Sequence, residues 1–301
     1  MDRLQAMQVF VRVAESGGFA EAARKLHMSP PAVTRAIAGV EERLGTRLFV
    51  RTTRSVKLTE AGQRFLDDCK RILADIEEAE GAAGGSYAAP TGTLTVSAPV
   101  LFGQMYVLPI LTDFLDRHPG VTGRALFLDR VTHLIDEGID VAVRIGHLPD
   151  SSYSATRVGF VRRVVCGSSR YFARRDIPLV PADLLRHRLI APATAWTSLD
   201  WHFGATEKST VHVSPALFCS TNESAIAAAV AGWGLTRPLS YQIGPQLSAG
   251  TLQTVLDDWE EEPLPIHVVH PEGRRPSAKV RAFVDLTVER LRRNPLFNLR
   301  G

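Results

Sequence analysis

Residues 29–45 read SPPAVTRAIAGVEERLG, and this stretch has the pattern of a short amphipathic helix. Ser29 stands at an N-cap position, and Pro30 and Pro31 follow it in the one helical turn that tolerates proline. Thr34 and Arg35 lie near the start of the helix, outside its apolar stripe. That stripe recurs every three or four residues, at Val33, Ile37, Val40 and Leu44. The stretch predicts a helix whose exposed N-terminal end presents a hydroxyl and a guanidinium group.

Two further helical segments precede this stretch. The first is ended by Ser16-Gly17-Gly18, and the second runs from Phe19 to about His27. A turn of about three residues then leads into residues 30–44, which makes a helix-turn-helix. In that motif the N-terminal end of the second helix lies in the DNA major groove, where Arg35 donates to guanine and Thr34 meets a base or a phosphate. The predicted inward residues are Leu4, Met7, Phe10, Val11 and Ala14 in the first segment and Ala20, Ala23 and Leu26 in the second.

The segment after Gly45 reads as a short β-hairpin, or wing, with apolar residues at 48–50 and a polar turn at 52–53. Its cations would contact the DNA backbone, although they could also serve surface solubility alone. Residues 24–57 carry eight Lys and Arg against two Glu, a net charge of +6, which favours a polyanionic partner. The predicted DNA-contacting residues are Ser29, Pro30, Pro31, Thr34, Arg35, Arg51, Thr53 and Arg54.

A long amphipathic helix is predicted over residues 59–80, with Thr59 as its N-cap, a net charge of −4 over the segment and an acidic face opposite the apolar one. Its apolar stripe indicates pairing with a second copy of the chain; the alternative is that the stripe packs back on its own domain. The stripe consists of Phe65, Leu66, Cys69, Ile72, Leu73, Ile76 and Ala79. The breaker-rich residues 81–91 then form a hinge. The predicted domains are a DNA-binding domain at 1–58, the linker helix at 59–80, the hinge, and a second domain at 92–301.

From residue 93 onward, apolar strands alternate with helical segments, which favours an α/β domain with a mainly parallel sheet. The alternation of strands and helices occurs in two successive parts of the chain. The strand at 264–271 and the helix at 277–292 then return to the first of these parts. We therefore expect two lobes with crossing connections, as in periplasmic-type binding proteins: one at about 92–162 and 266–301, the other at about 163–265. A ligand would bind in the cleft between them.

Residues 16–62 resemble the winged helix-turn-helix of LysR-type transcriptional regulators. The segments PTGTLTVSAPVLFG, HLIDEGIDVAVRIGHL, AAVAGWGLTRPLSYQI and KVRAFVDLTVERL resemble successive landmarks of that family's sensor domain. The resemblance implies a dimer paired through the linker helix, an operator as DNA partner and a small-molecule effector. Pro30 departs from the family, since many members carry a glutamine there that contacts a base.

Three loops are predicted to meet in the cleft, at residues 97–103, 144–148 and 220–223. The first of them enters a helix whose free amides favour an anion. Val100 and Leu101 stand where relatives often offer a hydroxyl, which speaks against a simple carboxylate effector. Trp196 and Trp201 would line the cleft or fill the core. The predicted effector-binding residues are Ser97, Pro99, Val100, Leu101, Phe102, Gly103, Phe127, Gly146, His147, Trp196, Thr221 and Asn222.

The sequence shows no nucleophile elbow and no phosphate-binding glycine loop. His267 and His270 would point to opposite faces of a strand, and three scattered cysteines make no zinc cluster, so we expect neither a metal nor a cofactor. The first residues lack a signal peptide's apolar core, which predicts a cytoplasmic protein. An enzyme and a solute carrier are the alternatives, but neither needs a helix-turn-helix. The expected partners are double-stranded DNA, an effector, one or three further copies of the chain, and RNA polymerase as a candidate.

Overall fold

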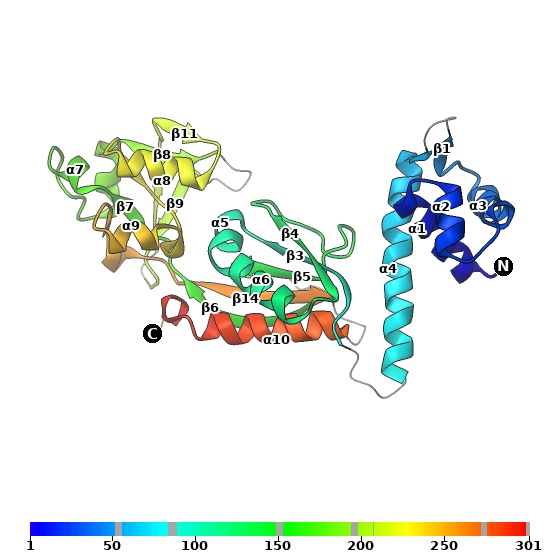
Figure 1. The fold of residues 1–301 in the computed structure, drawn as a ribbon. Coiled ribbons are helices and arrows are strands. Elements are labelled where there is room, and N and C mark those ends of the chain that lie inside the picture. Colours follow the sequence, from blue (N-terminus) through cyan, green and yellow to red (C-terminus); the bar gives the residue numbers. More distant parts are fainter. Residues whose placement is uncertain are drawn as a thin grey trace. The chain divides into compact units, whose positions relative to one another are not determined.

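The computed structural model describes residues 1–51, 56–83, 89–148, 153–193, 198–206, 208–271 and 276–298. The chain divides into two compact units, Met1–Ala89 and Pro90–Gly301 (Figure 1). The first unit is helical with a small hairpin, and the second contains two mixed α/β lobes.

The N-terminal unit is built around the ring of Phe10, whose centroid lies 5.2 Å from that of Phe49 and 5.0 Å from that of Phe65. These rings join the first helix, the hairpin and the last helix into one core. The elements are α1 (Arg3–Ser16), α2 (Phe19–Lys25), α3 (Pro30–Leu44), β1 (Phe49–Arg51), β2 (Val56–Leu58) and α4 (Glu60–Ala83). The predicted hinge at 81–91 therefore begins too early, because residues 81–83 continue α4.

The buried faces of the first helices differ in part from the predicted ones. Val33, Ile37 and Val40 of α3 are buried as predicted, but Leu44 is 45% exposed because α3 ends directly after it at Gly45, where φ is 64°. In α1 the buried set is Ala6, Val9, Phe10 and Val13, and in α2 it is Ala22 and Ala23 while Ala20 is exposed. Helix α1 packs against α2, α3 and α4 at once, so its buried face is wider than one stripe.

Helix α4 is divided between two roles. The Thr59 hydroxyl caps it by accepting from the Gly62 N–H at 2.9 Å. Leu66 and Cys69 are buried in the core of the N-terminal unit, so the first half of the apolar stripe packs back on its own domain. The second half, at Ile72, Leu73 and Ile76, remains partly exposed.

The first lobe of the C-terminal unit is a five-stranded sheet in the order β4-β3-β5-β14-β6. Its strands are β3 (Gly92–Ala98), β4 (Val121–Phe127), β5 (Val141–Ile145), β6 (Tyr153–Val161) and β14 (Leu264–Pro271). Strand β3 runs parallel to β4 and β5, whereas β14 runs antiparallel to β5 and β6. Four of the five strands therefore run in one direction, and β14 runs against them because the chain returns from the second lobe in the opposite direction.

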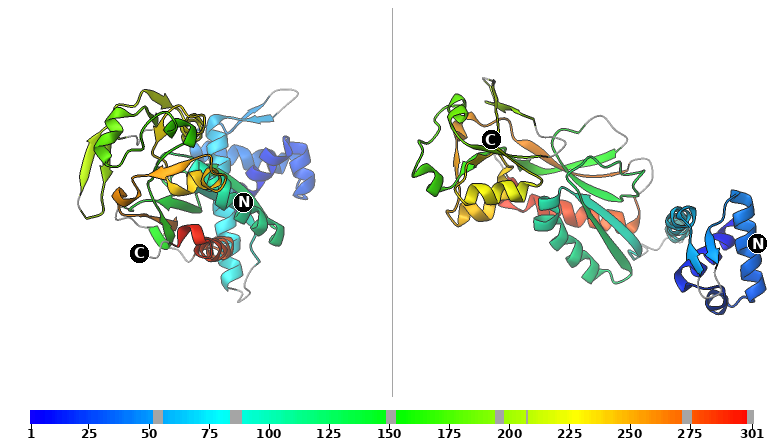
Figure 2. Two further views of the ribbon diagram at one scale, coloured as in Figure 1. Left: turned by 90° about the vertical axis from the view of Figure 1, so that its left-hand side faces the viewer. Right: turned by 90° about the horizontal axis from the view of Figure 1, so that it is seen from above.

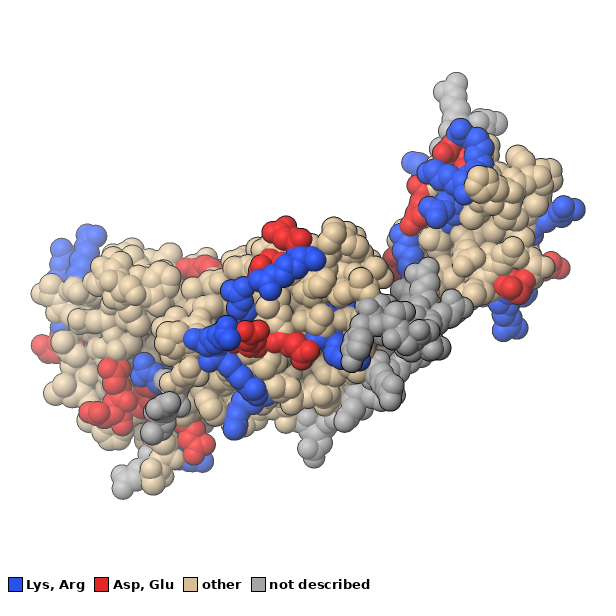
Figure 3. All heavy atoms as spheres, turned by 60° about the horizontal axis from the view of Figure 1, so that its bottom comes forward, with Lys and Arg blue, Asp and Glu red and all other residues tan. Residues whose placement is uncertain are grey.

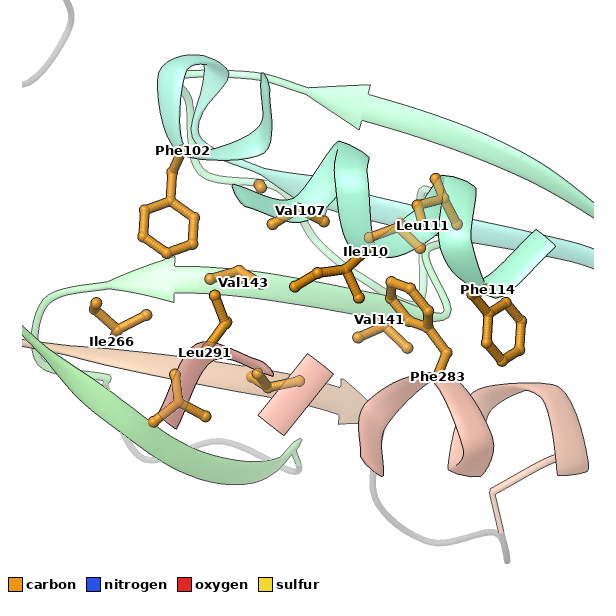
Figure 4. Packing of buried hydrophobic residues seen from close by; sticks show 14 of the residues in the cluster. Phe102, Val107, Ile110, Leu111, Phe114, Val141, Val143, Ile266, Phe283 and Leu291 are labelled. Atoms are coloured by element: carbon orange, nitrogen blue, oxygen red, sulfur yellow. The ribbon is translucent and has the colours of Figure 1, made fainter. Parts of the chain in front are cut away.

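Helices pack on one face of this sheet. These are α5 (Val100–Phe102), the π-turn η1 (Gly103–Val107), α6 (Leu108–Arg117) and α10 (Ala278–Arg292). Helix α10 runs beside β14 in Figure 1 and is seen end-on in the left view of Figure 2. Val141 and Val143 point toward the helices, as Figure 4 shows, and the intervening Ala142 belongs to a smaller cluster with Leu134 and Ile139. This alternation is that of a strand buried on both faces.

The second lobe holds a sheet in the order β11-β8-β12-β7-β13 and the hairpin β9–β10. Trp201 is 6% exposed in its core. The strands are β7 (Val165–Gly167), β8 (Leu189–Pro192), β9 (Asp200–Phe203), β10 (Ser209–His212), β11 (Leu217–Cys219), β12 (Leu235–Thr236) and β13 (Gln253–Val255). The helices are α7 (Ser169–Phe172), η2 (Pro181–Arg186), α8 (Asn222–Val230), η3 (Ser240–Ile243), α9 (Gly244–Ser248) and η4 (Asp257–Trp259), while η5 (Pro295–Phe297) follows α10 in the first lobe.

Ion pairs join the two segments that cross between the lobes. Arg162 lies 2.8 Å from Glu260, and Glu261 lies 3.4 Å from Arg163 and 3.0 Å from Arg237. Burial lowers the pKa of Arg237 to about 10, and its guanidinium, 4.6 Å from the centre of the Phe203 ring, stays charged at neutral pH. The crossover strands are thus tied to each other and to the second lobe.

Among the glycines of the first lobe, Gly103 has the least room for a side chain, since a Cβ there would lie 2.3 Å from the ring of Phe127. We expect Gly103→Ala to lower the free energy of unfolding of the C-terminal unit by about 1–3 kcal/mol, the range for overpacking a core. All four tryptophans lie in this unit, at 196, 201, 233 and 259, so urea unfolding followed by tryptophan fluorescence measures it alone. Gly244→Ala is the matched control, because a Cβ there meets nothing within 4 Å. Equal stability of the two variants would contradict the packing argument.

Candidate DNA-binding surface and effector pocket

The turn between α2 and α3 is fixed by backbone hydrogen bonds. The N–H of Met28 donates to the carbonyl of Ala23 at 2.9 Å, and the N–H of His27 donates to that of Arg24 at 3.2 Å. This is the Schellman arrangement that ends a helix, and it places His27 in the left-handed region at φ 53°. The next helix then starts within three residues, as the helix-turn-helix requires.

The exposed start of α3 carries the predicted base-reading residues. The Ser29 hydroxyl caps the helix by accepting from the Ala32 N–H at 3.4 Å, and Pro30 and Pro31 follow in the first turn. The Thr34 hydroxyl donates to the Pro30 carbonyl at 3.0 Å, so only its lone pairs are left for a partner. Arg35 is exposed and forms no hydrogen bond or ion pair with any residue that the structure describes. Arg35 is therefore the side chain here that is free to donate to DNA.

The wing is attached to α3 by one carboxylate. Glu41 Oε1 accepts from the N–H of Leu48 at 2.8 Å and of Phe49 at 3.2 Å, which sets the start of β1. Strands β1 and β2 pair antiparallel, with Arg51 opposite Val56. Thr53, Arg54 and the side chain of Arg51 lie outside the described residues. Figure 3 shows Lys and Arg side chains on the N-terminal unit, in keeping with the basic segment of its sequence.

At the start of α5, one of the backbone amides that were predicted to favour an anion already has a partner. The Val100 N–H donates to Asp129 Oδ1 at 2.9 Å, so a carboxylate of the chain itself holds that position. Ser97 is only 3% exposed within β3, and Pro99 is the N-cap residue of α5. An anionic ligand placed here would meet the negative charge of Asp129.

Phe102 and Gly103 belong to the core rather than to a ligand site, which corrects their prediction. Phe102 is fully buried, and its ring centroid lies 5.1 Å from those of Tyr106 and Tyr241 and 5.4 Å from that of Phe297. Figure 4 shows its side chain pointing into the cluster beneath α5. The ring of Phe127 packs so closely on Gly103 that it leaves no room for a Cβ atom at that position. Their apolar sequence pattern is that of a core, whereas the prediction of ligand contacts came from the place of residues 97–103 between the first strand and the following helix.

A pocket of about 350 Å³ lies where α5 of the first lobe meets the second lobe. Of the predicted effector-binding residues within the described ranges, only Leu101 lines this pocket. Its side chain packs against the hydrophobic clusters of both lobes. Glu223 lies in one of the three predicted loops, whereas the remaining walls went unpredicted. The pocket is lined by Leu101, Glu223, Ile226, Ala227, Val230, Gln242 and Gln246. Those walls come from one face of α8 and from η3 and α9. The only sequence signal for them was the spacing of three and four residues along the short, alanine-rich α8.

The pocket contains two oxygen acceptors that no described residue engages. Gln246 Oε1 is buried and has no hydrogen-bond partner among the described residues. The Gln242 side chain is already engaged, since its Oε1 accepts from the Leu239 N–H at 2.9 Å and its Nε2 donates to Tyr241 Oη at 3.4 Å. The carboxylate of Glu223 and the free oxygen of Gln246 are thus left to receive hydrogen bonds from a ligand.

The other predicted effector residues that the structure describes do not line this pocket. Thr221 caps α8 by accepting from the Ser224 N–H at 3.2 Å, directly before Asn222. Gly146 adopts φ 116°, a conformation that favours glycine, and its N–H donates to the Pro265 carbonyl at 2.9 Å. His147 is exposed, and Trp196 lies outside the described residues. The glycine at 146 is therefore explained by the backbone conformation directly after β5.

Burial makes two thiols unreactive. It raises the pKa of Cys69 to about 12, with a smaller contribution from Asp68, and that of Cys166 to about 12. Within the described part of the chain, no three His, Cys, Asp or Glu side chains come together as a metal site. No described helix is both long enough and apolar enough to cross a membrane.

Comparison with known proteins agrees with this arrangement. Residues 4–63 match the model of the bacterial regulatory helix-turn-helix protein of the lysR family, and residues 88–292 match the LysR substrate binding domain. An HTH-type transcriptional repressor of Pseudomonas aeruginosa is 31% identical, over 99% of this chain and 95% of its own length. The structure of CrgA, a LysR-type transcriptional regulator from Neisseria meningitidis, is similar with a TM-score of 0.62 and 26% identity, covering 97% of this chain and 99% of that one.

The full-length structure of the Vibrio cholerae virulence activator AphB has the same fold, with a TM-score of 0.61 and 24% identity over 96% of this chain and 99% of that one. The family matches cover both units in order, and the relatives extend over nearly the whole chain. The chain therefore belongs to the LysR family of transcriptional regulators, with a helix-turn-helix DNA-binding domain followed by an effector-binding domain.

Proposed function

We propose that this regulator reads its operator with the start of α3 and the wing, and that it responds to a ligand bound between Leu101 and α8. The observation that carries the DNA-binding part is the free, exposed guanidinium of Arg35 at the start of α3. A guanidinium so placed matches the two acceptors of guanine in the major groove. The wing arginines Arg51 and Arg54 would contact phosphates and add affinity without base preference.

The effector is an apolar molecule that carries hydrogen-bond donors and no negative charge. Four side chains of the pocket wall are aliphatic, namely Leu101, Ile226, Ala227 and Val230. Two oxygen acceptors, the Glu223 carboxylate and Gln246 Oε1, face a ligand here, and a buried carbonyl oxygen without a partner costs free energy until a donor reaches it. A carboxylate ligand would instead be repelled by Glu223.

The chain works as a homodimer, or as a tetramer built from dimers, through the second half of α4. The side chains of Ile72, Leu73 and Ile76 are not fully buried within their own unit, and they continue the stripe whose first half is core. Since operator DNA and RNA polymerase are in the cytoplasm, we place its action there. Its role is regulation without catalysis, as in the regulators that it matches.

Arg35→Ala should weaken binding to the operator by about 1–3 kcal/mol and leave binding to random DNA nearly unchanged, because it removes a base contact. The operator is first mapped by footprinting the promoter next to the gene. Binding of the two DNAs is then measured by fluorescence anisotropy at several salt concentrations. Arg43→Ala is the matched control, since Arg43 is exposed in the last turn of α3. An equal loss on both DNAs would show that Arg35 contacts only the backbone.

Ala227→Phe should abolish the response to effector, because the new ring fills the pocket from an exposed position on α8. Operator affinity without effector should stay within about 0.5 kcal/mol, as expected for distant sites. The effector is identified by thermal-shift screening of uncharged and cationic compounds. Ser224→Phe, on the same helix but outside the pocket, should respond like the wild type. A full response of the Ala227→Phe variant would place the effector elsewhere.

Ile76→Asp should dissociate the dimer by placing a charge in the apolar seam between two α4 helices. Sedimentation equilibrium of the full chain measures this, and circular dichroism verifies that the variant is folded. Gln63→Asp is the control, because it adds the same charge at an exposed position near the start of the helix. If the Ile76→Asp chain stayed dimeric, another surface would have to hold the copies together.

A further inference from the structure

A second pocket, of about 410 Å³, lies wholly within the second lobe, and arginines line it. Arg170, Arg174 and Arg175 come from α7 and the turn after it, and Arg188 precedes β8. The remaining wall is Tyr171 and the segment Ala231–Trp233 that follows α8. Two separate segments of the chain thus bring four guanidinium groups to one concavity, and a third segment completes its wall.

These four arginines have no ionic partner that would account for them. None of them forms an ion pair with a carboxylate in the described part of the chain, and all four are exposed. Asp183, an acidic residue nearby in sequence, is engaged by the N–H groups of Leu179 and Val180, at 3.0 and 3.1 Å. Four like charges around one hollow repel each other, so their gathering favours the entry of an anion.

Two of the arginines are held in place through their backbone or stem. The N–H of Arg188 donates to Tyr171 Oη at 3.1 Å, and its carbonyl accepts from the N–H of Leu235 at 2.8 Å. Its guanidinium carbon lies 5.6 Å from the centre of the Trp233 ring. The stem of Arg170 packs over Gly232, where a Cβ would lie 3.3 Å from it. Their charged ends are therefore positioned without being neutralised.

We propose that this pocket binds a small soluble polyanion, with two or more negative charges on phosphate or carboxylate groups. Guanidinium groups bind both of these with paired hydrogen bonds. The volume falls in the range of small-molecule sites, and the charges surround a hollow instead of forming the extended stripe that tracks a nucleic acid. The site is separate from the pocket beside Leu101, which offers acceptors and suits the opposite kind of ligand.

The test uses the full chain with pyrophosphate and with citrate as probes, at constant ionic strength set by chloride. Binding is followed by titration calorimetry and by tryptophan fluorescence. A fluorescence change that disappears in Trp233→Phe assigns the binding to this pocket, which matters because the N-terminal unit is also basic. We expect at least one of the two probes to bind with this signature.

Arg174→Gln and Arg188→Gln should each weaken that binding about tenfold or more, the loss expected for one charge-assisted contact. Arg186→Gln, an exposed arginine of the same lobe outside the pocket, should stay within about twofold of the wild type. Unchanged melting temperatures establish that the variants are folded. Arg174→Gln is the variant least expected to alter the fold, because the exposed side chain of Arg174 forms no hydrogen bond or ion pair with the described residues. Absence of binding by both probes overturns the proposal, as does an equal loss in Arg186→Gln. A Trp233 signal given by DNA and by neither probe overturns it too.

Discussion

Phe102 packs against three aromatic rings that come from different parts of the C-terminal unit. Tyr106 follows it in the same lobe, Tyr241 belongs to η3 of the second lobe, and Phe297 lies near the end of the chain. Burying these rings fixes α5 against the second lobe, and burial also raises the pKa of Tyr241, which stays neutral in the cluster. The position of Leu101, and with it the pocket between the lobes, depends on this packing.

The two pockets share helix α8 but differ in their electrostatics. One face of α8 contributes aliphatic side chains and Glu223 to the pocket between the lobes, while the residues directly after the helix line the arginine pocket. An anion that suits the arginine pocket would be repelled by Glu223 in the other one. Both ligands would contact the same short helix or its C-terminal extension, so each can affect how α8 sits on the sheet beneath it.

Much of the fold was predictable because it follows from local pattern. Proline after a capping serine defines the start of α3, and the strand at 264–271 was predicted with its observed bounds. The pocket was harder, because Gln246 and Ala227 carry no local signal and meet Leu101 only through tertiary packing. Phe102 was predicted as a ligand contact from its place in the loop after the first strand, whereas its burial depends on Tyr241 and Phe297, which are far away in sequence. The antiparallel return of β14 likewise follows from the crossing of the chain between lobes, which periodicity does not encode.

Helix α4 begins as part of one folded module and ends outside it. Leu66 and Cys69 complete the core around Phe10, while Ile72 and Ile76 do not. For the construction of chimeric regulators, this division decides where two parent sequences can be joined. A junction at the end of the wing, beside Leu58, would give the DNA-binding module a foreign core, because its last wall would come from the other parent. A junction beyond Ile76 keeps the module whole. The chimera would then take both its operator preference and its pairing through α4 from the parent that supplies this module.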